Sequence, residues 1–456
     1  MNVFSITAIS PIDGRYFEMT SILKKLFSEY GLLKFRIKIE ILWLKQLSMH
    51  AELKELPSFN QSIIKILTEI EENFNEEDAL YIKILEKKNQ HDVKSIEYFL
   101  KNKIQMQLNC SINLEFIHFS CTSDDINNLA YALILKDTRK NILIPLWDNI
   151  IQEIKKMVFK YKNIAILSRT HGQAATPSTM GKEIANFLYR MMRQLKIFKK
   201  IDILGKINGT VGNYNAHHVA YPNINWHKFS QEFVTGLGIK WNPFTTQIEP
   251  HDYISELLDC IIRFNNILLD FNRDIWSYIS INYFNQNVNE NEVGSSIMPH
   301  KINPIDFENS EGNLGLSNSI MQHMSNKLLI SRWQRDLSDS TVLRNLGVAV
   351  SYSVIAYKSV LSGISKLQIN KKVLFTDLEM HWEILAEPIQ TMMRKNNIKN
   401  SYEILKKMTR GKKINQKLIR DFINTLNIPD QEKRQLQLLT PHNYLGYASR
   451  IVDEII

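Results

Sequence analysis

The chain has 456 residues, enough for two or three domains, with 44% hydrophobic and 23% charged side chains. Its 16 glycines and 12 prolines amount to roughly half of the average usage, which excludes collagen-like chains, long linkers and turn-rich β-sandwiches. The net charge of +9 is scattered, without the basic stripe and interleaved aromatic residues that are typical of nucleic-acid binding. The composition predicts a compact, mostly helical protein.

The first residues of the chain and its cysteines indicate in which cellular compartment the protein resides. Residues 1–5 lack the basic and apolar regions of a secretory signal, and the apolar run 129–135 is far shorter than the ~20 residues of a membrane span. Cys110, Cys121 and Cys260 form an odd set without metal-ligand spacing, which favours free thiols in a reducing compartment. We therefore expect a cytoplasmic protein.

Apolar residues recur at helical spacing in long stretches that run from residue 143 to 161, 184 to 198, 254 to 275 and 341 to 361. This pattern predicts a bundle of long antiparallel helices between about residues 112 and 365. The helices are apolar on more than one face, as at Phe264, Ile267 and Phe271, so we expect them to pack against other subunits. Residues 203–212 break the helical period and predict a hairpin or loop, and Gly411 precedes a last, smaller helical lobe.

Two polar segments in the first half of the chain carry imidazoles and hydroxyls at predicted helix starts. They are His91-Asp92 and residues 118–125, and their serine and aspartate residues are equally suited to plain helix capping. A third polar segment, residues 168–179, precedes a predicted helix and contains His171. A histidine there can act as an acid or base near neutral pH, although a lone loop histidine also serves as an ordinary surface residue.

The densest unusual segment is residues 294–309, a Gly-Ser loop that passes through two prolines before a helix can begin. Asn303 before Pro304 fits the N-cap and first position of a helix. Serine hydroxyls, Lys301 and a helix N-terminus together favour a bound anion. The alternative is an ordinary loop followed by a capped helix.

Arginines complete the set of candidate binding residues: Arg15, Arg332, Arg335 and Arg344. Several guanidinium groups near one cleft would suit carboxylates and a phosphate, which they bind in bidentate fashion, whereas each alone fits an ordinary surface position. The glycines at 205, 209 and 212 lack the spacing of a nucleotide fingerprint, and the sequence contains no Walker lysine motif or zinc pattern.

These segments resemble a known family. Residues 294–304 are similar to the signature loop Gly-Ser-Ser-x-Met-Pro-x-Lys-x-Asn-Pro of the fumarase/aspartase superfamily. Residues 169–173 with 176–177, 120–125 and 332–336 resemble the adenylosuccinate lyase family, in its bacterial purine-biosynthesis form, and the likeness runs from Ser10 to Gly446. The chain departs from the family pattern at Gln90, Ala174 and Ile297, where Asn, Pro and Thr are frequent.

The resemblance implies a mainly α subunit with a helical N-terminal domain (1–111), a central bundle with the signature loop (112–365) and a helical C-terminal domain (366–456). It implies a homotetramer with sites shared between subunits, and no metal, organic cofactor, nucleic acid or membrane. The implied reaction releases fumarate from adenylosuccinate to give AMP. The same site would split succinyl-aminoimidazole-carboxamide ribotide.

By the same resemblance, Ser295 is the general base and His171 the general acid. A serine is a poor base in water, so its surroundings must ionise it, and Lys301 and backbone N–H groups are suitable sources of that field. The family pattern also places a set of residues on the substrate: Arg15, Tyr16, Gln90, His91, Asp92, Thr122, Ser123, Gln247, Ser296, Lys301, Ile302, Asn303, Asn309, Arg335, Ser340, Thr341, Val342, Leu343 and Arg344.

Two other functions stay open at this point. One is a fumarate-releasing lyase of the same superfamily that acts on argininosuccinate or aspartate, and the segments around His91 and Arg335 argue against it. The other is a non-catalytic structural or nucleic-acid-binding protein on the same fold, against which the scattered basic residues argue.

Overall fold

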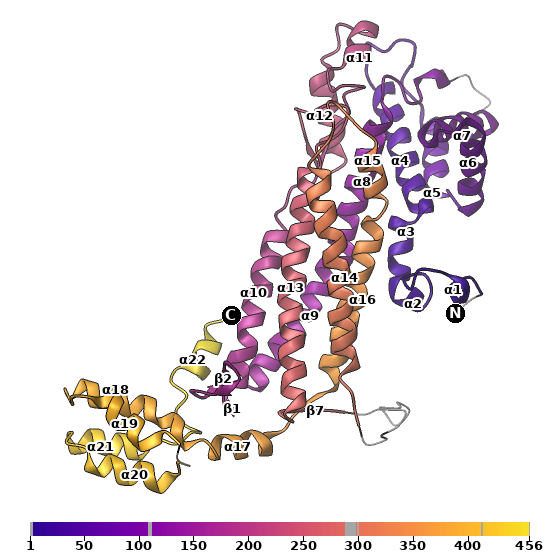
Figure 1. The fold of residues 1–456 in the computed structure, drawn as a ribbon. Helices are drawn as coiled ribbons and strands as arrows, with labels where there is room; N and C mark the ends of the chain where they lie inside the picture. The colour runs from indigo at the N-terminus through magenta and orange to yellow at the C-terminus, as the bar shows by residue number, and fades with distance from the viewer. Residues whose placement is uncertain (1–2, 108–111, 288–297, 299–300, 412–413, 456) are drawn as a thin grey trace. The chain divides into compact units, whose positions relative to one another are not determined.

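The computed structural model describes residues 3–107, 112–287, 298, 301–411 and 414–455. Contacts group the chain into two compact units, each assembled from three separate stretches. Unit 1 comprises residues 1–147, 195–265 and 312–356, and unit 2 comprises residues 148–194, 266–311 and 357–456. Helices dominate both units, which confirms the predicted mainly α fold (Figure 1).

Long helices run through both units, and they contain the predicted apolar stripes. They are α9 (Ile144–Lys160), α10 (Met180–Phe198), α13 (Asp252–Ser280), α14 (Ile305–Leu328) and α16 (Leu346–Lys366). The last predicted stripe, 341–361, is divided between α16 and the short α15 (Ser338–Leu343). The sequence predicted only the start of α14, because apolar residues do not line a single face of that helix.

The rest of unit 1 consists of short and medium helices and one pair of short strands. These elements are α1 (Val3–Thr7), α2 (Phe17–Thr20), η1 (Ser21–Leu23), α3 (Lys24–Phe27), α4 (Glu29–Ser48), α5 (Gln61–Glu72), α6 (Glu76–Asn89), α7 (Asp92–Gln107), η2 (Leu114–Phe116), α8 (Ser123–Thr138), η3 (Arg139–Leu143), β5 (Leu204–Gly205), α11 (Asn215–Ala220), α12 (Trp226–Gly236) and β6 (Lys240–Trp241). Strand β5 pairs in parallel with β6, so residues 203–212 form a loop with one short strand and not a hairpin.

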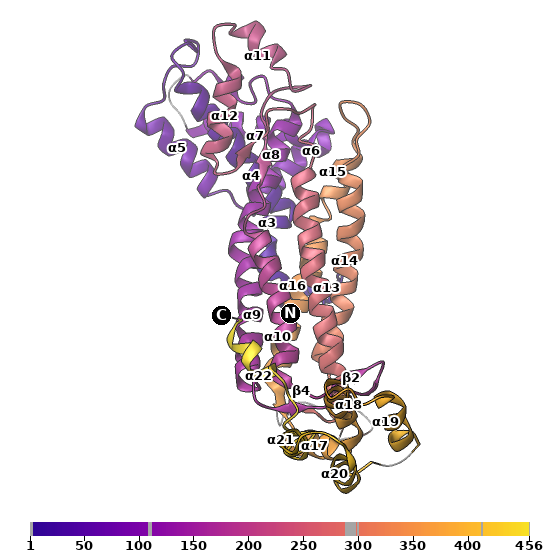
Figure 2. The same ribbon diagram turned by 90° about the vertical axis from the view of Figure 1, so that its left-hand side faces the viewer.

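Unit 2 adds three antiparallel strand pairs and a group of short C-terminal helices (Figure 2). The elements are β1 (Ala165–Ile166), β2 (Arg169–Thr170), β3 (Gln173–Ala174), β4 (Ser178–Thr179), β7 (Phe284–Gln286), β8 (Leu367–Ile369), α17 (Lys371–Glu379), η4 (Trp382–Leu385), α18 (Ala386–Lys395), α19 (Ser401–Thr409), α20 (Gln416–Thr425), α21 (Asp430–Gln437) and α22 (Ala448–Asp453). Gly411, at φ +73, follows α19 and leads into the last helices, as predicted.

The long helices pack through apolar residues and through polar groups that find partners inside each unit. In unit 1, buried Asn265 of α13 donates to Asn318 Oδ1 of α14 at 2.9 Å and to Ser353 Oγ of α16 at 3.0 Å. In unit 2, Asn272 of α13 donates to Ser310 Oγ of α14 at 2.9 Å. Such bonds remove the cost of a buried amide and fix how neighbouring helices align.

One apolar stretch within the described residues, Ser338–Lys366, is long and apolar enough to cross a membrane by length and composition, with a mean hydropathy of 1.3 in its most apolar window. However, 67% of that window is buried inside the protein. A buried core helix passes the same test, so the stretch is weak evidence for a membrane span.

A glycine sets the spacing between α9 and α10 in unit 2. A Cβ added to Gly181 would lie 2.4 Å from the Val158 carbonyl oxygen and 2.6 Å from the Lys162 Cα. We expect Gly181→Ala to lower the free energy of unfolding by about 1–3 kcal/mol, because the obstructing atoms belong to the backbone and cannot rotate away. Urea unfolding of both proteins measures the change.

The matched control is Gly236→Ala, at the end of α12, where an added Cβ meets nothing within 4 Å. Alanine there should leave the unfolding free energy unchanged or slightly higher. Equal stability of Gly181→Ala and the parent chain would show that α9 and α10 can move apart without cost.

Candidate functional site

Unit 1 gathers one group of predicted substrate residues around Asp92. Helix α6 ends at Asn89, its cap residue Gln90 has a left-handed φ of 56°, and α7 begins at Asp92. Arg36 Nη2 lies 2.8 Å and Arg344 Nη2 lies 3.4 Å from Asp92 Oδ2. Burial raises the pKa of Asp92, but the charges of Arg36 and Arg344 and the hydrogen bonds it accepts lower it more, so this carboxyl is held in its ionised form.

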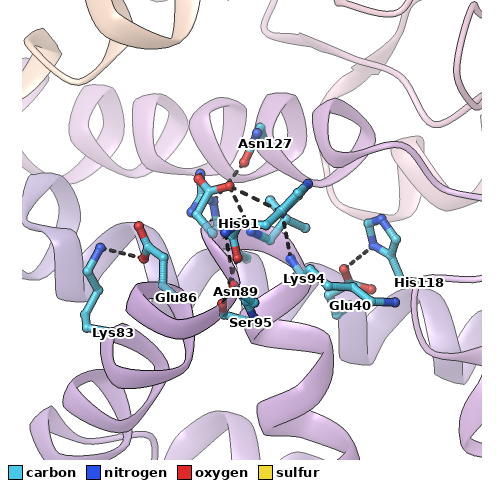
Figure 3. Close-up of polar contacts among 12 residues, drawn as sticks. Glu40, Lys83, Glu86, Asn89, His91, Lys94, Ser95, His118 and Asn127 are labelled. Atoms are coloured by element: carbon cyan, nitrogen blue, oxygen red, sulfur yellow. Dashed lines mark hydrogen bonds and ion pairs between the residues drawn. The ribbon is translucent and has the colours of Figure 1, made fainter.

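His91 stands beside this group with an accessible ring. Its side chain is 53% exposed, and Nδ1 accepts the backbone N–H of Lys94 at 3.2 Å. Figure 3 shows His91 next to Asn89, Lys94 and Ser95, with Asn127 above them. Because Nδ1 accepts this bond, the proton of the neutral ring resides on Nε2. His91 can therefore donate from Nε2 to a ligand.

Thr122 is the N-cap of α8 and Ser123 its first residue; of the serine and aspartate caps that the sequence allowed, the structure shows Asp125. The Thr122 N–H donates to Asp125 Oδ2 at 2.9 Å. Asp125 also accepts from Lys206 Nζ at 2.8 Å and from the backbone N–H groups of Asn208 and Gly209 at 2.9 and 3.0 Å. The Lys206 and Asp125 side chains are both 0% exposed. This buried ion pair, whose carboxylate accepts four hydrogen bonds, fixes the backbone that presents Thr122 and Ser123.

Gln247 and Arg335 meet at an open pocket of about 760 Å³, which they line together with residues 332–337. Arg335 Nη1 donates to Gln247 Oε1 at 3.2 Å, and Gln247 Nε2 donates to the Thr210 carbonyl at 2.9 Å. The pocket lies within the size range of small-molecule sites. Arg335 therefore lies at a cleft, together with a second arginine, Arg332.

Residues 340–344 form the end of α15 and the residue after it. Asp339 Oδ1 accepts the Ser340 N–H at 2.7 Å, while Thr341 and Arg344 are exposed and Val342 is partly exposed. Leu343 is only 4% exposed, so its side chain packs in the core and only its backbone can reach a ligand. Arg344 also lines a pocket with Ser10 and Asp13. Arg15 is exposed and Tyr16 partly exposed at the start of α2, and neither lines that pocket.

His171 lies in unit 2 at the tip of a hairpin. Strands β2 and β3 pair Thr170 with Gln173, so His171 and Gly172 are the two turn residues, with φ of 53° and 75°. Such a two-residue turn with positive φ matches the twist of a hairpin. Arg169 anchors the first strand through Asp377 at 2.7 Å. The imidazole is exposed at the tip, as expected for a group that meets a ligand.

The signature loop is described only at its end. Ser295 and Ser296, like Ile297, lie outside the described residues. Lys301 and Ile302 are exposed and Asn303 is partly exposed, and Asn309 of α14 donates to Ser359 Oγ at 2.8 Å. The Pro304 carbonyl accepts the first helical N–H groups, so Pro304 holds the cap position that was predicted for Asn303.

Two buried charged residues near these sites, Arg36 and Glu40, were not predicted. Arg36 donates to Asn127 Oδ1 at 2.8 Å as well as to Asp92. His118 Nδ1 lies 2.6 Å from Glu40 Oε1 (Figure 3). Burial lowers the pKa of His118, but the charge and hydrogen bond of Glu40 raise it more. The available signal was that Arg36 and Glu40 stand on the otherwise apolar face of a helix, where a charge requires a partner.

Among the residues that the structure describes, no group of three His, Cys, Asp or Glu side chains could hold a metal ion. Neither of the two cysteines in the described part of the chain, Cys121 and Cys260, forms a disulfide there.

Comparisons with known proteins cover the chain from end to end. A family model described as "Lyase" matches residues 14–317, and one described as "Adenylosuccinate lyase C-terminal" matches residues 331–445. The chain is 60% identical to an adenylosuccinate lyase of Buchnera aphidicola subsp. Acyrthosiphon pisum over 455 residues, which is 100% of both chains. It is 56% identical to that of Escherichia coli K12, again over 100% of both chains.

Solved structures of low identity share the fold. A fumarate lyase from Mesorhizobium sp. BNC1 superposes with a TM-score of 0.77 at 14% identity, covering 95% of this chain and 97% of that one. A 3-carboxy-cis,cis-muconate lactonizing enzyme from Pseudomonas putida gives a TM-score of 0.75 at 16% identity, covering 95% and 96%.

Proposed function

The chain belongs to the adenylosuccinate lyase family, and from this premise we propose how its residues release fumarate. It is a carbon–nitrogen lyase of purine biosynthesis that converts adenylosuccinate to AMP and fumarate. The observation that carries this conclusion is the 60% identity, over the full length of both chains, with a relative named adenylosuccinate lyase. We propose succinyl-aminoimidazole-carboxamide ribotide as a second substrate of the same site, because it carries the same succinyl group on nitrogen.

The proposed elimination uses Ser295 and His171. Ser295 removes a proton from the carbon next to a substrate carboxylate, and the negative charge spreads into that carboxylate. The bond between the neighbouring carbon and nitrogen then breaks, its electron pair goes to the nitrogen, and His171 donates a proton there. A carbon–carbon double bond remains in fumarate. The exposed position of His171 at a hairpin tip supports this role.

Lys301 and Asn303 lie at the end of the signature loop. They are proposed to stabilise the negative charge that develops on the substrate carboxylate. Both follow the proposed base closely in sequence, and Lys301 is exposed. Ser296, Ile302 and Asn309 are proposed to contact the substrate from the same segment.

Unit 1 is proposed to hold the two ends of the substrate. Two arginines supply guanidinium groups that suit the phosphate and the carboxylates. Arg335 is bonded to Gln247, and Arg344 lies beside Asp92. The proposed contacts from the remaining segments are Arg15, Tyr16, Gln90, His91, Thr122, Ser123, Ser340, Thr341, Val342 and, through its backbone, Leu343.

We propose a homotetramer in which each site takes residues from several subunits. Support comes from large apolar side chains that the single chain leaves exposed on the long helices: Tyr189 is 56%, Trp276 is 43% and Leu316 is 51% exposed. We also propose three domains, which divide after residues 111 and 365. The proposed location is the cytoplasm, without nucleic-acid or membrane partners.

The test of the proposed function is an absorbance assay for fumarate with separate additions of adenylosuccinate, argininosuccinate and aspartate. We expect rapid release from adenylosuccinate and none above background from the other two. Preferential release from argininosuccinate or aspartate would replace the assignment with another lyase of the superfamily. Steep, salt-dependent binding to random DNA without any fumarate release would favour the non-catalytic function.

A further inference from the structure

His251 is a buried histidine that none of the roles above uses. It stands immediately before α13 in unit 1, is 2% exposed and has a φ of 66°. Its Nε2 lies 3.4 Å from Asp339 Oδ2, and its Nδ1 lies 3.8 Å from Glu249 Oε2. Its backbone N–H donates to Glu249 Oε2 at 2.8 Å. A buried imidazole between carboxylates is stabilised in its charged form.

A further carboxylate, Asp124, acts on the same imidazole through its charge. Asp124 is 3% exposed, and its Oδ2 has no hydrogen-bond partner among the described residues. Burial lowers the pKa of His251, but the hydrogen bond with Asp339 and the charges of Asp124, Glu249 and Asp339 raise it more. His251 is thus a buried positive charge within this acidic group, alongside Lys206 and Arg335, which also act on Asp124.

Each of these carboxylates belongs to a different segment of the proposed substrate site. Asp124 directly follows Thr122 and Ser123 at the start of α8. Asp339 directly precedes residues 340–344, and its Oδ1 fixes the Ser340 N–H at 2.7 Å. Glu249 and His251 follow Gln247 in one loop. The imidazole therefore lies between the loop of Gln247 and the segment that precedes residues 340–344, and it is within electrostatic reach of Asp124 at the start of α8.

We propose that the imidazolium of His251 is a positioning residue that holds these three segments together, so that its charge sets the affinity for the nucleotide. This inference rests on the proposed function, because it takes residues 122–123, 247 and 340–344 as substrate contacts. His251 itself needs no contact with the substrate.

Other charged and titratable groups nearby shape the titration of this cluster. Arg335 acts on both Asp124 and Asp339, Lys206 acts on Asp124, and Asp252 acts on Glu249. Burial raises the pKa of Tyr253 well above its ordinary value, so the phenol stays neutral. Because the pKa of His251 is raised, its charge is fully present at low pH and is lost as the pH rises through that raised value. The KM should then rise on the alkaline side.

The experiment compares His251→Gln with the parent chain and with His323→Gln, an exposed histidine of α14 in the same unit. Steady-state kinetics with adenylosuccinate and calorimetric binding of AMP are measured across the alkaline range, with thermal unfolding as a check of folding. We expect His251→Gln to raise KM and the Kd of AMP by roughly tenfold or more, the effect of losing a charged hydrogen bond, with kcat within about threefold. Its KM should not rise further with pH, whereas the parent and His323→Gln should show that rise.

A second variant keeps the inference testable if His251→Gln does not fold. Asp339→Asn retains the shape of the side chain but removes one negative charge, so it should lower the pKa of His251 and move the rise in KM to lower pH. In the double variant His251→Gln/Asp339→Asn, the increase in KM should be smaller than the sum of the increases in the two single variants, expressed as free energies.

Two results would overturn the positioning role: a KM and Kd within about twofold of the parent at every pH, or a loss confined to kcat. If the parent released no fumarate from adenylosuccinate, the proposed function would fail, and AMP affinity alone would decide on His251. An unchanged AMP affinity in His251→Gln would then reject the positioning role as well.

Discussion

Ser295→Ala is expected to abolish nearly all turnover while adenylosuccinate still binds. The hydroxyl is proposed to remove the proton that starts the elimination, so its loss acts on the transition state and not on ground-state affinity. A general base contributes about 10²–10⁴-fold to a rate, and kcat should fall by that order. Stopped assays for fumarate measure kcat, and calorimetry of the inactive variant with adenylosuccinate measures affinity. A variant that kept near-normal kcat would require a different base.

His171→Ala should also lower kcat by about 10²–10⁴-fold and alter one limb of the pH–rate profile, because the proposed acid that protonates the leaving nitrogen is removed. His171 has a positive φ, so alanine adds backbone strain at the hairpin tip. His171→Asn is the matched variant, since asparagine tolerates that conformation but cannot act as an acid. Both variants should lose activity equally.

The role of His171 as an acid has a second consequence. The loss of kcat in both variants should shrink for a substrate analogue whose leaving group needs no protonation. An equal loss with that analogue would assign His171 to binding or to the structure of the turn.

The helical fold could be predicted from the sequence because periodic apolar residues determine it locally. Leu258, Ile261 and Leu268 repeat at helical spacing, and all three are buried in α13. The hairpin at His171 was harder to foresee, since non-glycine residues as a class seldom adopt positive φ and the sequence shows only a polar loop before a helix. Local spacing cannot show which strand will close such a turn.

The cap at the start of α8 was predictable from residue types, because an aspartate in the first turn suits helix capping, and Asp125 accepts the Thr122 N–H there. The ion pairs behind the candidate site were not predictable. Asp125 and Lys206 are 81 residues apart in sequence, and Arg36 and Asp92 are 56 apart, yet both pairs lie 2.8 Å apart in unit 1. Only the tertiary fold brings such partners together, and a lone charge in a helix does not identify its partner.

The most direct test of sites shared between subunits mixes two inactive proteins, His171→Ala and Ser295→Ala, under conditions that exchange subunits. If one site takes His171 from one chain and Ser295 from another, some sites of the hybrid hold both intact residues, and part of the activity returns. Each variant alone, treated in the same way, should stay inactive. Fumarate release by the mixture is the predicted result. No recovery, with subunit exchange demonstrated by differently tagged chains, would show that each chain builds its own catalytic pair.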